Sequence, residues 1–397
     1  MGVLPSLPYE MLELIFEKIC KNPLDCLSFA KVAKDWRSVA VEKRRNILPR
    51  IMILKVHEHE GLLALSSSAG NWEIPLPEVQ NKECLTSNKG WLLVADSELG
   101  EIFILNPLSK DRIQLPSLPS ELMHQNLKEL QHTKRAIFTL KFNSICDYTV
   151  AMTFWRRVSI HRTGKENNWL TTLRFLFILD SAVDIAYYKE DIITIHNNGG
   201  VQAVEPYISR YQISTPSDNA LGKYADSAET IVNKSHLVET PKKELLKVCR
   251  YEKLISGGSE QYATFDFEVF QWGGWKRTWV KVENLGEQVV FLGLNSICLS
   301  AQDVPECTPN SIYFLDYMDN SGWSDMGVFN MEEGCIKPSL HDCHSFEPAA
   351  PIWFTPNLQS KLPPQISYHN LFPSSRFAPS FVFRPWRKLQ GLTLLGL

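Results

Sequence analysis

Between residues 51 and 356 the sequence is a long series of short apolar runs separated by turn residues. The first four runs each hold four or five residues and lie at 51–54, 61–65, 91–95 and 102–105. Runs of this length suit strands, because helices in globular proteins usually need about ten residues or more. Turn residues such as Asn106-Pro107 close the runs. The pattern therefore predicts an all-β fold for most of the chain.

The number of runs and their total length favour one all-β architecture over the others. Further runs lie at 136–142, 148–155, 174–179, 183–188, 192–196, 245–251, 264–272, 275–282, 289–292, 311–315 and 326–330. Residues 51–356 exceed what one sandwich needs, and a propeller blade takes about 40–50 residues. We therefore expect an all-β propeller of six or seven blades rather than a sandwich or a barrel. No WD dipeptide and no regular double-glycine kelch signature marks the repeats.

The first 45 residues differ from the rest, because their apolar residues recur at helical spacing. The residues that share one face of a first predicted helix are Leu12, Ile15, Phe16 and Ile19. Pro8 suits the first turn of this helix and Pro23 the start of a second, while Trp36 belongs to a third. Three short helices hold too few residues to bury a core of their own. We therefore expect their apolar side chains to contact a partner.

This N-terminal segment resembles an F-box. The residues that match the family pattern, in order, are Leu7, Pro8, Leu12, Ile15, Asp25, Leu27, Val32, Lys34, Trp36 and Arg37. Ala33 stands where the family usually has Cys, and it keeps a small residue there. The resemblance implies docking on a Skp-type adaptor through Leu7, Pro8, Leu12, Ile15, Leu27, Val32 and Trp36. The alternative is a helical hairpin packed on its own domain.

A second resemblance covers roughly residues 60–356. Its segments include Gly90-Trp91-Leu92-Leu93, Ile104-Leu105-Asn106-Pro107-Leu108, Phe267-Glu268-Val269-Phe270 and Pro351-Ile352-Trp353-Phe354. The region is similar to the KIB-type β-propeller that follows the F-box in plant proteins. The expected domains are a small all-α F-box module of three helices at 1–48, the all-β propeller at 51–356, and a basic, proline-containing tail at 357–397. The tail is either a disordered or alternative terminus, or a docking segment.

Together the two resemblances imply a substrate-recognition subunit of an SCF-type (cullin–RING) E3 ubiquitin ligase. The F-box would bind the Skp-type adaptor, and through it the cullin, while the propeller would bind an unknown target protein. Three tryptophans are candidate target contacts, of which the first two are alternatively lids at a blade rim: Trp272, Trp275 and Trp323. The alternatives are a propeller-based enzyme or small-molecule sensor, and an adaptor-bound scaffold that does not cause degradation.

Composition and motifs exclude several other classes of protein. A net charge of −3 argues against a general nucleic-acid binder. Nine scattered cysteines suggest no disulfide framework, and no signal peptide or run of 18 apolar residues is present. No phosphate-binding loop, GxSxG motif or standard zinc spacing occurs, since Cys335, His341, Cys343 and His344 match none. We expect no enzyme activity, cofactor, metal or membrane contact, and a cytoplasmic or nuclear location.

Two local features carry more detailed expectations. Gly273-Gly274 suits a two-residue hairpin turn, which would pair Trp272 with Trp275. In that register the apolar face holding Phe267, Val269, Val280 and Val282 lies between blades. Residues 214–234 are polar and small, and predict a long loop that contributes to target binding together with the loop near Trp323. We expect the target surface to lie away from the Leu48-Pro49 junction.

Overall fold

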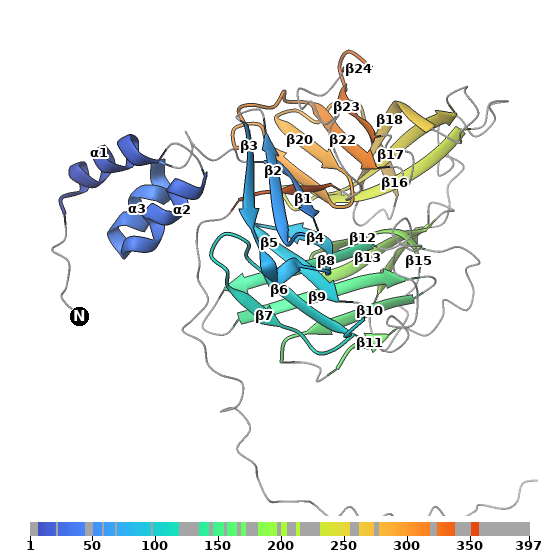
Figure 1. The fold of residues 1–397 in the computed structure, drawn as a ribbon. Coiled ribbons are helices and arrows are strands. Elements are labelled where there is room, and N and C mark those ends of the chain that lie inside the picture. Colours follow the sequence, from blue (N-terminus) through green and yellow to red (C-terminus); the bar gives the residue numbers. More distant parts are fainter. Residues whose placement is uncertain are drawn as a thin grey trace, which may run out of the picture. The chain divides into compact units, whose positions relative to one another are not determined.

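The strands of the computed structural model form six sheets, which follow three N-terminal helices in the chain (Figure 1). The structure describes residues 7–20, 23–43, 51–57, 59–67, 70–96, 98–118, 135–142, 146–154, 157–164, 168–171, 182–196, 200–204, 212–214, 231–254, 262–273, 278–317, 324–337 and 351–356. The expected tail at 357–397 lies outside this part of the chain, as does the predicted strand at 174–179.

The helices are α1 (Tyr9–Ile19), α2 (Pro23–Val32) and α3 (Lys34–Lys43). Aromatic rings connect all three of them. The ring centres of Phe16 and Phe29 lie 5.1 Å apart, and those of Phe29 and Trp36 lie 4.6 Å apart. An ion pair of 2.9 Å between Lys43 Nζ and Glu13 Oε1 adds a contact between α1 and α3. The helices therefore do bury apolar groups against one another, contrary to the expectation from their length.

Six sheets, here called blades 1 to 6, follow in chain order. Blade 1 consists of β25 (Ile352–Phe354), β1 (Met52–His57), β2 (Leu62–Ser67) and β3 (Gly70–Pro75), followed by the short 3-10 helix η2 (Pro77–Val79). Blade 2 consists of β4 (Glu83–Asn88), β5 (Trp91–Asp96), β6 (Glu101–Leu105) and β7 (Arg112–Gln114). Blade 3 consists of β8 (Arg135–Phe142), β9 (Cys146–Phe154), β10 (Arg157–Arg162) and β11 (Leu170–Thr171).

Blades 4 and 5 repeat this four-stranded order, and blade 6 adds a strand. Blade 4 consists of β12 (Ala182–Tyr188), β13 (Asp191–His196), β14 (Val201–Val204) and β15 (Gln212–Ser214). Blade 5 consists of β16 (Ile231–Glu239), β17 (Leu245–Leu254), β18 (Tyr262–Trp272) and β19 (Trp279–Val282). Blade 6 consists of β21 (Ser296–Ser300), β20 (Gln288–Leu292), β22 (Ser311–Tyr317), β23 (Ser324–Asn330) and β24 (Cys335–Lys337).

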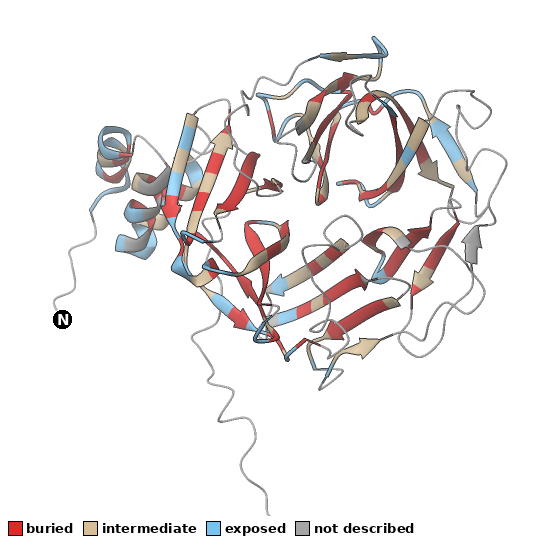
Figure 2. Cartoon of the chain, turned by 45° about the vertical axis from the view of Figure 1, so that its right-hand side comes forward, coloured by how far each residue is buried: buried red, intermediate tan, exposed pale blue. Residues whose placement is uncertain are grey.

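One edge strand of each sheet contacts the corresponding edge strand of the next sheet. These edge strands are, in order around the ring, β25, β4, β8, β12, β16 and β21. Blades 6 and 1 meet through Phe291 and Trp353, whose ring centres lie 5.0 Å apart. The sheets therefore form a closed six-bladed β-propeller, which confirms the expected fold and the lower of the two expected blade numbers. Because neighbouring blades cover both faces of a sheet, a strand such as β5 is buried at every residue (Figure 2).

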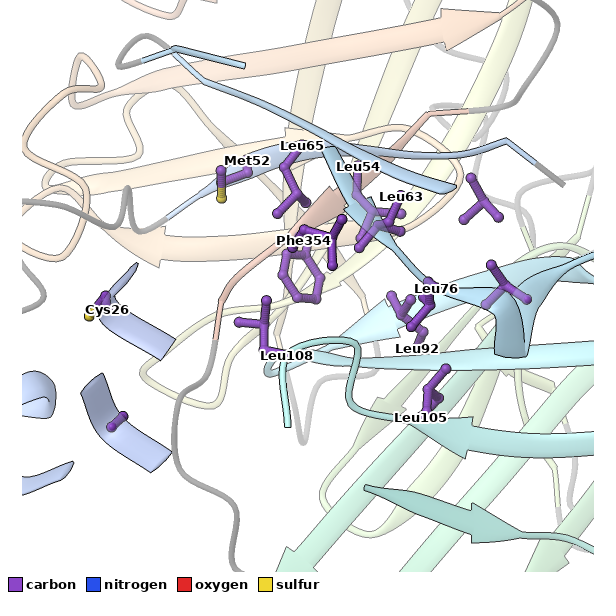
Figure 3. Close-up of a cluster of buried hydrophobic side chains, with 14 of the residues drawn as sticks. Cys26, Met52, Leu54, Leu63, Leu65, Leu76, Leu92, Leu105, Leu108 and Phe354 are labelled. Atoms are coloured by element: carbon purple, nitrogen blue, oxygen red, sulfur yellow. The ribbon is translucent and has the colours of Figure 1, made fainter. Parts of the chain in front are cut away.

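Blade 1 is completed by the C-terminal strand of the propeller. β25 pairs with β1, so that Met52 is opposite Phe354 and Leu54 is opposite Ile352. In Figure 3 Phe354 lies beside Leu54 and Leu65 of blade 1 and close to Leu108 of blade 2. Polar contacts fix the same strand, because Trp353 Nε1 donates to Leu292 O at 2.9 Å and Asn295 Nδ2 donates to Trp353 O at 2.9 Å. This strand joins the two ends of the propeller segment.

Strand direction separates two ends of the ring. Four antiparallel strands return the chain to the end where a blade began, so the connections at 115–134, 172–181 and 215–230 all join strands at one end. We call it the connection end. In blade 1 the chain runs through only three antiparallel strands, β1 to β3, before it passes to blade 2. Because three is an odd number, Met52 at the start of β1 lies at the end of the ring opposite the connection end. We call that one the Met52 end.

The expected hairpin at Gly273-Gly274 has a different register from the predicted one. Trp272 is paired with Trp279 and Val269 with Val282, so the partner strand is shifted by four residues. Gly273 N donates to Thr278 O at 2.9 Å, which makes a longer connection than a two-residue turn. An even shift keeps each residue on its face, and Phe267, Val269 and Val282 do pack between blades 5 and 6. Val280 is exposed instead, at 54%.

The loop expected at 214–234 is shorter than predicted. Ser214 ends β15, and Ile231 already begins β16, whose first four residues were assigned to the loop. Polar residues such as Asn233 and Lys234 hid this strand, because they break the apolar pattern. Residues 215–230 lie outside the described part of the chain.

Replacing Trp353 tests how far the ring depends on β25. Trp353→Ala removes a side chain that is 2% exposed and contacts blade 6, so we expect it to lower the free energy of unfolding by about 3–5 kcal/mol. Trp353→Phe keeps a ring but loses the bond to Leu292 O, and should cost much less. Urea unfolding of the two variants measures the difference. Equal, small losses would show that the closing strand is dispensable.

Candidate functional site

The first helix carries apolar residues on two opposite sides. Leu12 and Phe16 are buried, at 1% and 2% exposure. Met11 and Leu14 are about 48% and 53% exposed, and at 100° per residue they point away from that buried side. Leu7, two residues before the helix, is also exposed, at 38%. We call Leu7, Met11 and Leu14 the exposed α1 stripe.

The structure separates the residues that were predicted to bind the adaptor. Leu7 and Pro8 are exposed, and Val32 is 47% exposed, so these three are accessible. Ile15 and Trp36 are half-buried. Leu12 is buried, so it does not lie on the surface of the free module, and its contact with an adaptor stays a prediction. The side chain of Leu27 lies outside the described residues.

Met11 and Leu14 are the residues that sequence reasoning missed. The helical-spacing argument identified the stripe containing Leu12 and Phe16 and assigned it to a partner. A short helix that packs on two neighbours uses that stripe for its own core, and the second stripe remains exposed. The signal was present in the sequence as Leu7, Met11 and Leu14, which are spaced four and then three residues apart. Exposed apolar side chains grouped in this way are a candidate protein-binding surface.

The predicted target contacts on the propeller are only partly described. Trp272 is half-buried and packs edge-on against Trp279, with ring centres 5.2 Å apart. Both side chains border the apolar cluster between blades 4 and 5. Trp275 and Trp323 lie outside the described residues, so their role stays a prediction.

A cluster of charges joins blades 5 and 6, in which Arg250 and Glu252 are buried and Lys234 and Asp316 are partly exposed. Arg250 on β17 is 1% exposed, and its Nη2 donates to Asp325 Oδ2 at 2.7 Å while its Nη1 donates to Asp316 Oδ2 at 3.3 Å. Lys234 Nζ lies 2.7 Å from Asp316 Oδ2 and 3.0 Å from Glu252 Oε1. Each charged group therefore has an opposite partner within the protein, which is the condition for burying it at tolerable cost.

A second polar group lies at the centre of the ring. Arg135, at the start of β8 in blade 3, donates from Nη1 to the carbonyl oxygens of Gly293 and Leu294 in blade 6, at 3.1 and 3.2 Å. Its Nε lies 3.8 Å from Asp184 Oδ1 in blade 4. Blades 3 and 6 are opposite each other in a six-bladed ring, so this side chain reaches across the central channel. The contacts of Arg135 with two carbonyl oxygens and a carboxylate therefore connect blades 3, 4 and 6.

Burial and neighbouring charge shift the pKa values of these groups in opposite directions. Burial raises the pKa of the Asp184 carboxyl and lowers that of His236 well below its usual value. Burial also opposes ionisation of Asp316, but the charges of Arg250 and Lys234 outweigh it and hold the pKa of Asp316 at about 2. The carboxylate of Asp316 is therefore ionised at every physiological pH.

Within the described part of the chain, these charged groups do not form a metal site. Among the described residues, no group of three or more His, Cys, Asp or Glu side chains could hold a metal ion. His341, Cys343 and His344 lie outside that part of the chain. Within the same residues, none of the helices is sufficiently long and apolar to span a bilayer. The charges are satisfied mainly by one another, so the exposed α1 stripe is the stronger candidate for function.

Comparison with known proteins agrees with the architecture. The model of the KIB1-4 beta-propeller family matches residues 62–330, which include strands of all six blades. This match lies within the region where the sequence resembles a KIB-type propeller.

Relatives from Arabidopsis thaliana extend the similarity to most of the chain. A probable F-box protein is 24% identical over 321 residues, covering 71% of this chain and 77% of its own. The F-box protein SKIP23 is 22% identical over 381 residues, covering 84% of this chain and 90% of its own. A putative F-box protein is 22% identical over 336 residues, covering 77% and 81%. These matches confirm the resemblance to plant F-box proteins with a KIB-type propeller.

The charge cluster predicts how stability depends on acid. The pKa of Asp316 is about 2 in the folded protein and 3.8 ordinarily, so its ionised form stabilises the fold above pH 4 and this contribution is lost as the pH falls toward 2. Asp316→Asn should therefore be less stable than the wild type at pH 6, with a smaller difference at pH 3. Urea midpoints at the two pH values measure this. A difference that does not change with pH would contradict the assignment.

Proposed function

This chain belongs to the KIB1-4 β-propeller family, and we propose that it is the substrate-recognition subunit of an SCF-type (cullin–RING) E3 ubiquitin ligase. In this proposal the helices at 9–43 are an F-box that docks on a Skp-type adaptor, and the adaptor links the chain to a cullin. The propeller binds a target protein. The single observation that carries the adaptor role is the exposed α1 stripe on a small helical module.

The exposed α1 stripe suits an adaptor interface in its size and chemistry. Met11 and Leu14 offer unbranched and γ-branched apolar side chains on one side of a helix, a common arrangement for docking into the groove of a partner, and the exposed Leu7 precedes them in the chain. The opposite side of α1 is fixed by Leu12 and Phe16, so the stripe is presented in a defined orientation. The relatives from Arabidopsis thaliana are named F-box proteins, which supports the same role.

The protein itself would supply no bond-making chemistry. Binding both adaptor and target would raise the effective concentration of target lysines near the charged ubiquitin carrier. The buried charges at Arg250 and Arg135 would then serve to fix the blades, so that the target-binding surface keeps its shape. Transfer of ubiquitin belongs to the RING and ubiquitin-carrier components of the complex.

We propose the connection end of the propeller as the target surface. The chain enters the propeller at Met52, directly after the helical segment, and the connections at 115–134, 172–181 and 215–230 join strands at the opposite end. Long connections between strands are where binding residues concentrate. Trp272 ends β18 at the Met52 end, so in this proposal it packs between blades rather than contacting the target.

Truncating the exposed α1 stripe tests adaptor binding. The double variant Met11→Ala with Leu14→Ala should weaken binding to the Skp-type adaptor by about 2 kcal/mol or more, because both side chains would be buried on docking. Leu7→Ala with Pro8→Ala should also abolish binding. Calorimetry with purified adaptor measures both.

Leu99→Ala is the matched control, since Leu99 is an exposed leucine, at 74%, on a propeller turn. It should bind the adaptor like the wild type. Leu12→Ala should instead lower the stability of the helices. Adaptor affinity that is unchanged in both double variants would refute the F-box assignment.

Deleting residues 216–230 tests the proposed target surface. Targets can be identified by proximity labelling with a chain lacking residues 1–45, which should retain them without directing their degradation. The deletion variant should then capture fewer of these targets while binding the adaptor normally, because only the connection end is changed. If capture is also normal, this connection makes no contribution to the target surface.

A further inference from the structure

A buried lysine in blade 5 has no acidic partner. Lys247 on β17 is 2% exposed, although it carries a charge. Its Nζ lies 4.6 Å from the ring centre of Phe270 and 5.6 Å from that of Trp279. Among the described residues, no carboxylate lies within ion-pairing distance of this ammonium. Aromatic rings attract a cation, but they do not replace the hydrogen bonds that an ammonium loses when it leaves water.

A second donor without an acceptor lies beside it. The indole Nε1–H of Trp279 is buried and has no hydrogen-bond partner in the part of the chain that the structure describes. Buried indole groups are usually paired. Trp279 is on β19, two strands from Lys247, and the contact between its ring and the Lys247 ammonium brings the two donors to one place. Trp279 Nε1 is thus a buried donor without an acceptor, and among the described residues the Lys247 ammonium beside it has no ion-pair partner.

The carboxylates near this place are already engaged. Glu268 accepts a hydrogen bond of 2.6 Å from Tyr251 Oη through Oε2, and its Oε1 lies 3.2 Å from Lys281 Nζ. Glu244 accepts from Gln271 Nε2 at 3.0 Å. Neither can move to Lys247 without breaking its present contact. The unpaired charge at this place is therefore a single positive one.

The surroundings of the two donors are apolar. Trp272 and Trp279 pack against the cluster between blades 4 and 5 that contains Leu237 and Leu245. Phe270 belongs to a neighbouring cluster of blade 5, which Trp279 also borders. Trp272 and Trp279 are only half-buried, so the edge of the cluster reaches the surface. One positive charge in an aromatic setting matches one negative charge on an apolar body better than it matches a dianion such as phosphate.

We propose that Lys247 and Trp279 form a binding site for a small monocarboxylate with an apolar body, between blades 4 and 5. The carboxylate accepts from Lys247 Nζ and Trp279 Nε1, and the apolar body packs against Trp272 and Phe270. The site lies within the propeller, so it does not depend on adaptor binding. It gives this propeller a small-molecule ligand in addition to the target protein proposed above.

Sodium benzoate is the probe, and benzamide is its neutral isostere. Calorimetry on the full chain should detect benzoate, with benzamide at least tenfold weaker. Lys247→Met should weaken benzoate at least tenfold, because the charge and up to three donors are lost. Trp279→Phe keeps a ring without the N–H and should weaken it by several-fold. Lys253→Met removes an exposed lysine at the other end of β17 and should bind benzoate like the wild type.

The thermal midpoint without ligand separates a binding role from a packing role. An ammonium that waits for an anion is a cost in the empty protein, so Lys247→Met should melt at the same temperature as the wild type or higher. A clear fall in its midpoint would mean that Lys247 is a packing residue and would overturn the proposal. Equal binding of benzoate and benzamide, no binding of benzoate, or tighter binding of inorganic phosphate would also overturn it.

Discussion

The pairing of β25 with β1 is the interaction on which the rest of the propeller depends. Each blade has two apolar faces, and each face is covered only if the neighbouring blade is in place. A ring that failed to close would leave one face of blade 6 and one of blade 1 in water, with a free strand edge besides. Trp353 satisfies both needs at once, since it packs on Phe291 of blade 6 and bonds to Leu292 O from within blade 1.

Charged residues play a complementary part where the blades meet. Apolar contacts between sheets tolerate sliding, whereas an ion pair has one good geometry. Arg250 connects blade 5 to Asp316 and Asp325 of blade 6, and Arg135 connects blade 3 to carbonyls of blade 6 across the channel. Replacing a whole cluster of such groups by apolar residues is often neutral for stability, whereas removing one partner leaves a charge unpaired, so we ascribe to the cluster the register of the blades.

The sequence predicted the architecture well and several details poorly. Apolar runs located most central strands, because strands covered on both faces contain few polar residues. β16 was missed, because its Asn233, Lys234 and His236 resemble a solvated loop. In the structure Lys234 pairs with Asp316 in the charge cluster. The Gly273-Gly274 hairpin was misplaced because a turn motif fixes the register only when the turn is formed by those two residues alone.

The candidate site was likewise predicted only in part from the sequence. Helical spacing identified an apolar stripe on α1, but one sequence cannot say whether a stripe faces its own module or a partner. Leu12 belongs to the first kind, whereas Met11 is exposed and is a candidate for the second. Lys247 and Trp279 could not be connected in advance, because they meet only through the pairing of β17, β18 and β19. Contacts of this kind depend on strand register, which the sequence constrains weakly.

The measurement that tests the central claim most directly is reconstitution with purified adaptor and cullin. The full chain should form a stoichiometric complex with a Skp-type adaptor and bring the cullin with it on size-exclusion chromatography. A chain that begins at residue 46 should remain folded, because its ring closes without the helices, and should elute alone. A full chain that binds no adaptor, or a shortened chain that still binds it, would contradict the account.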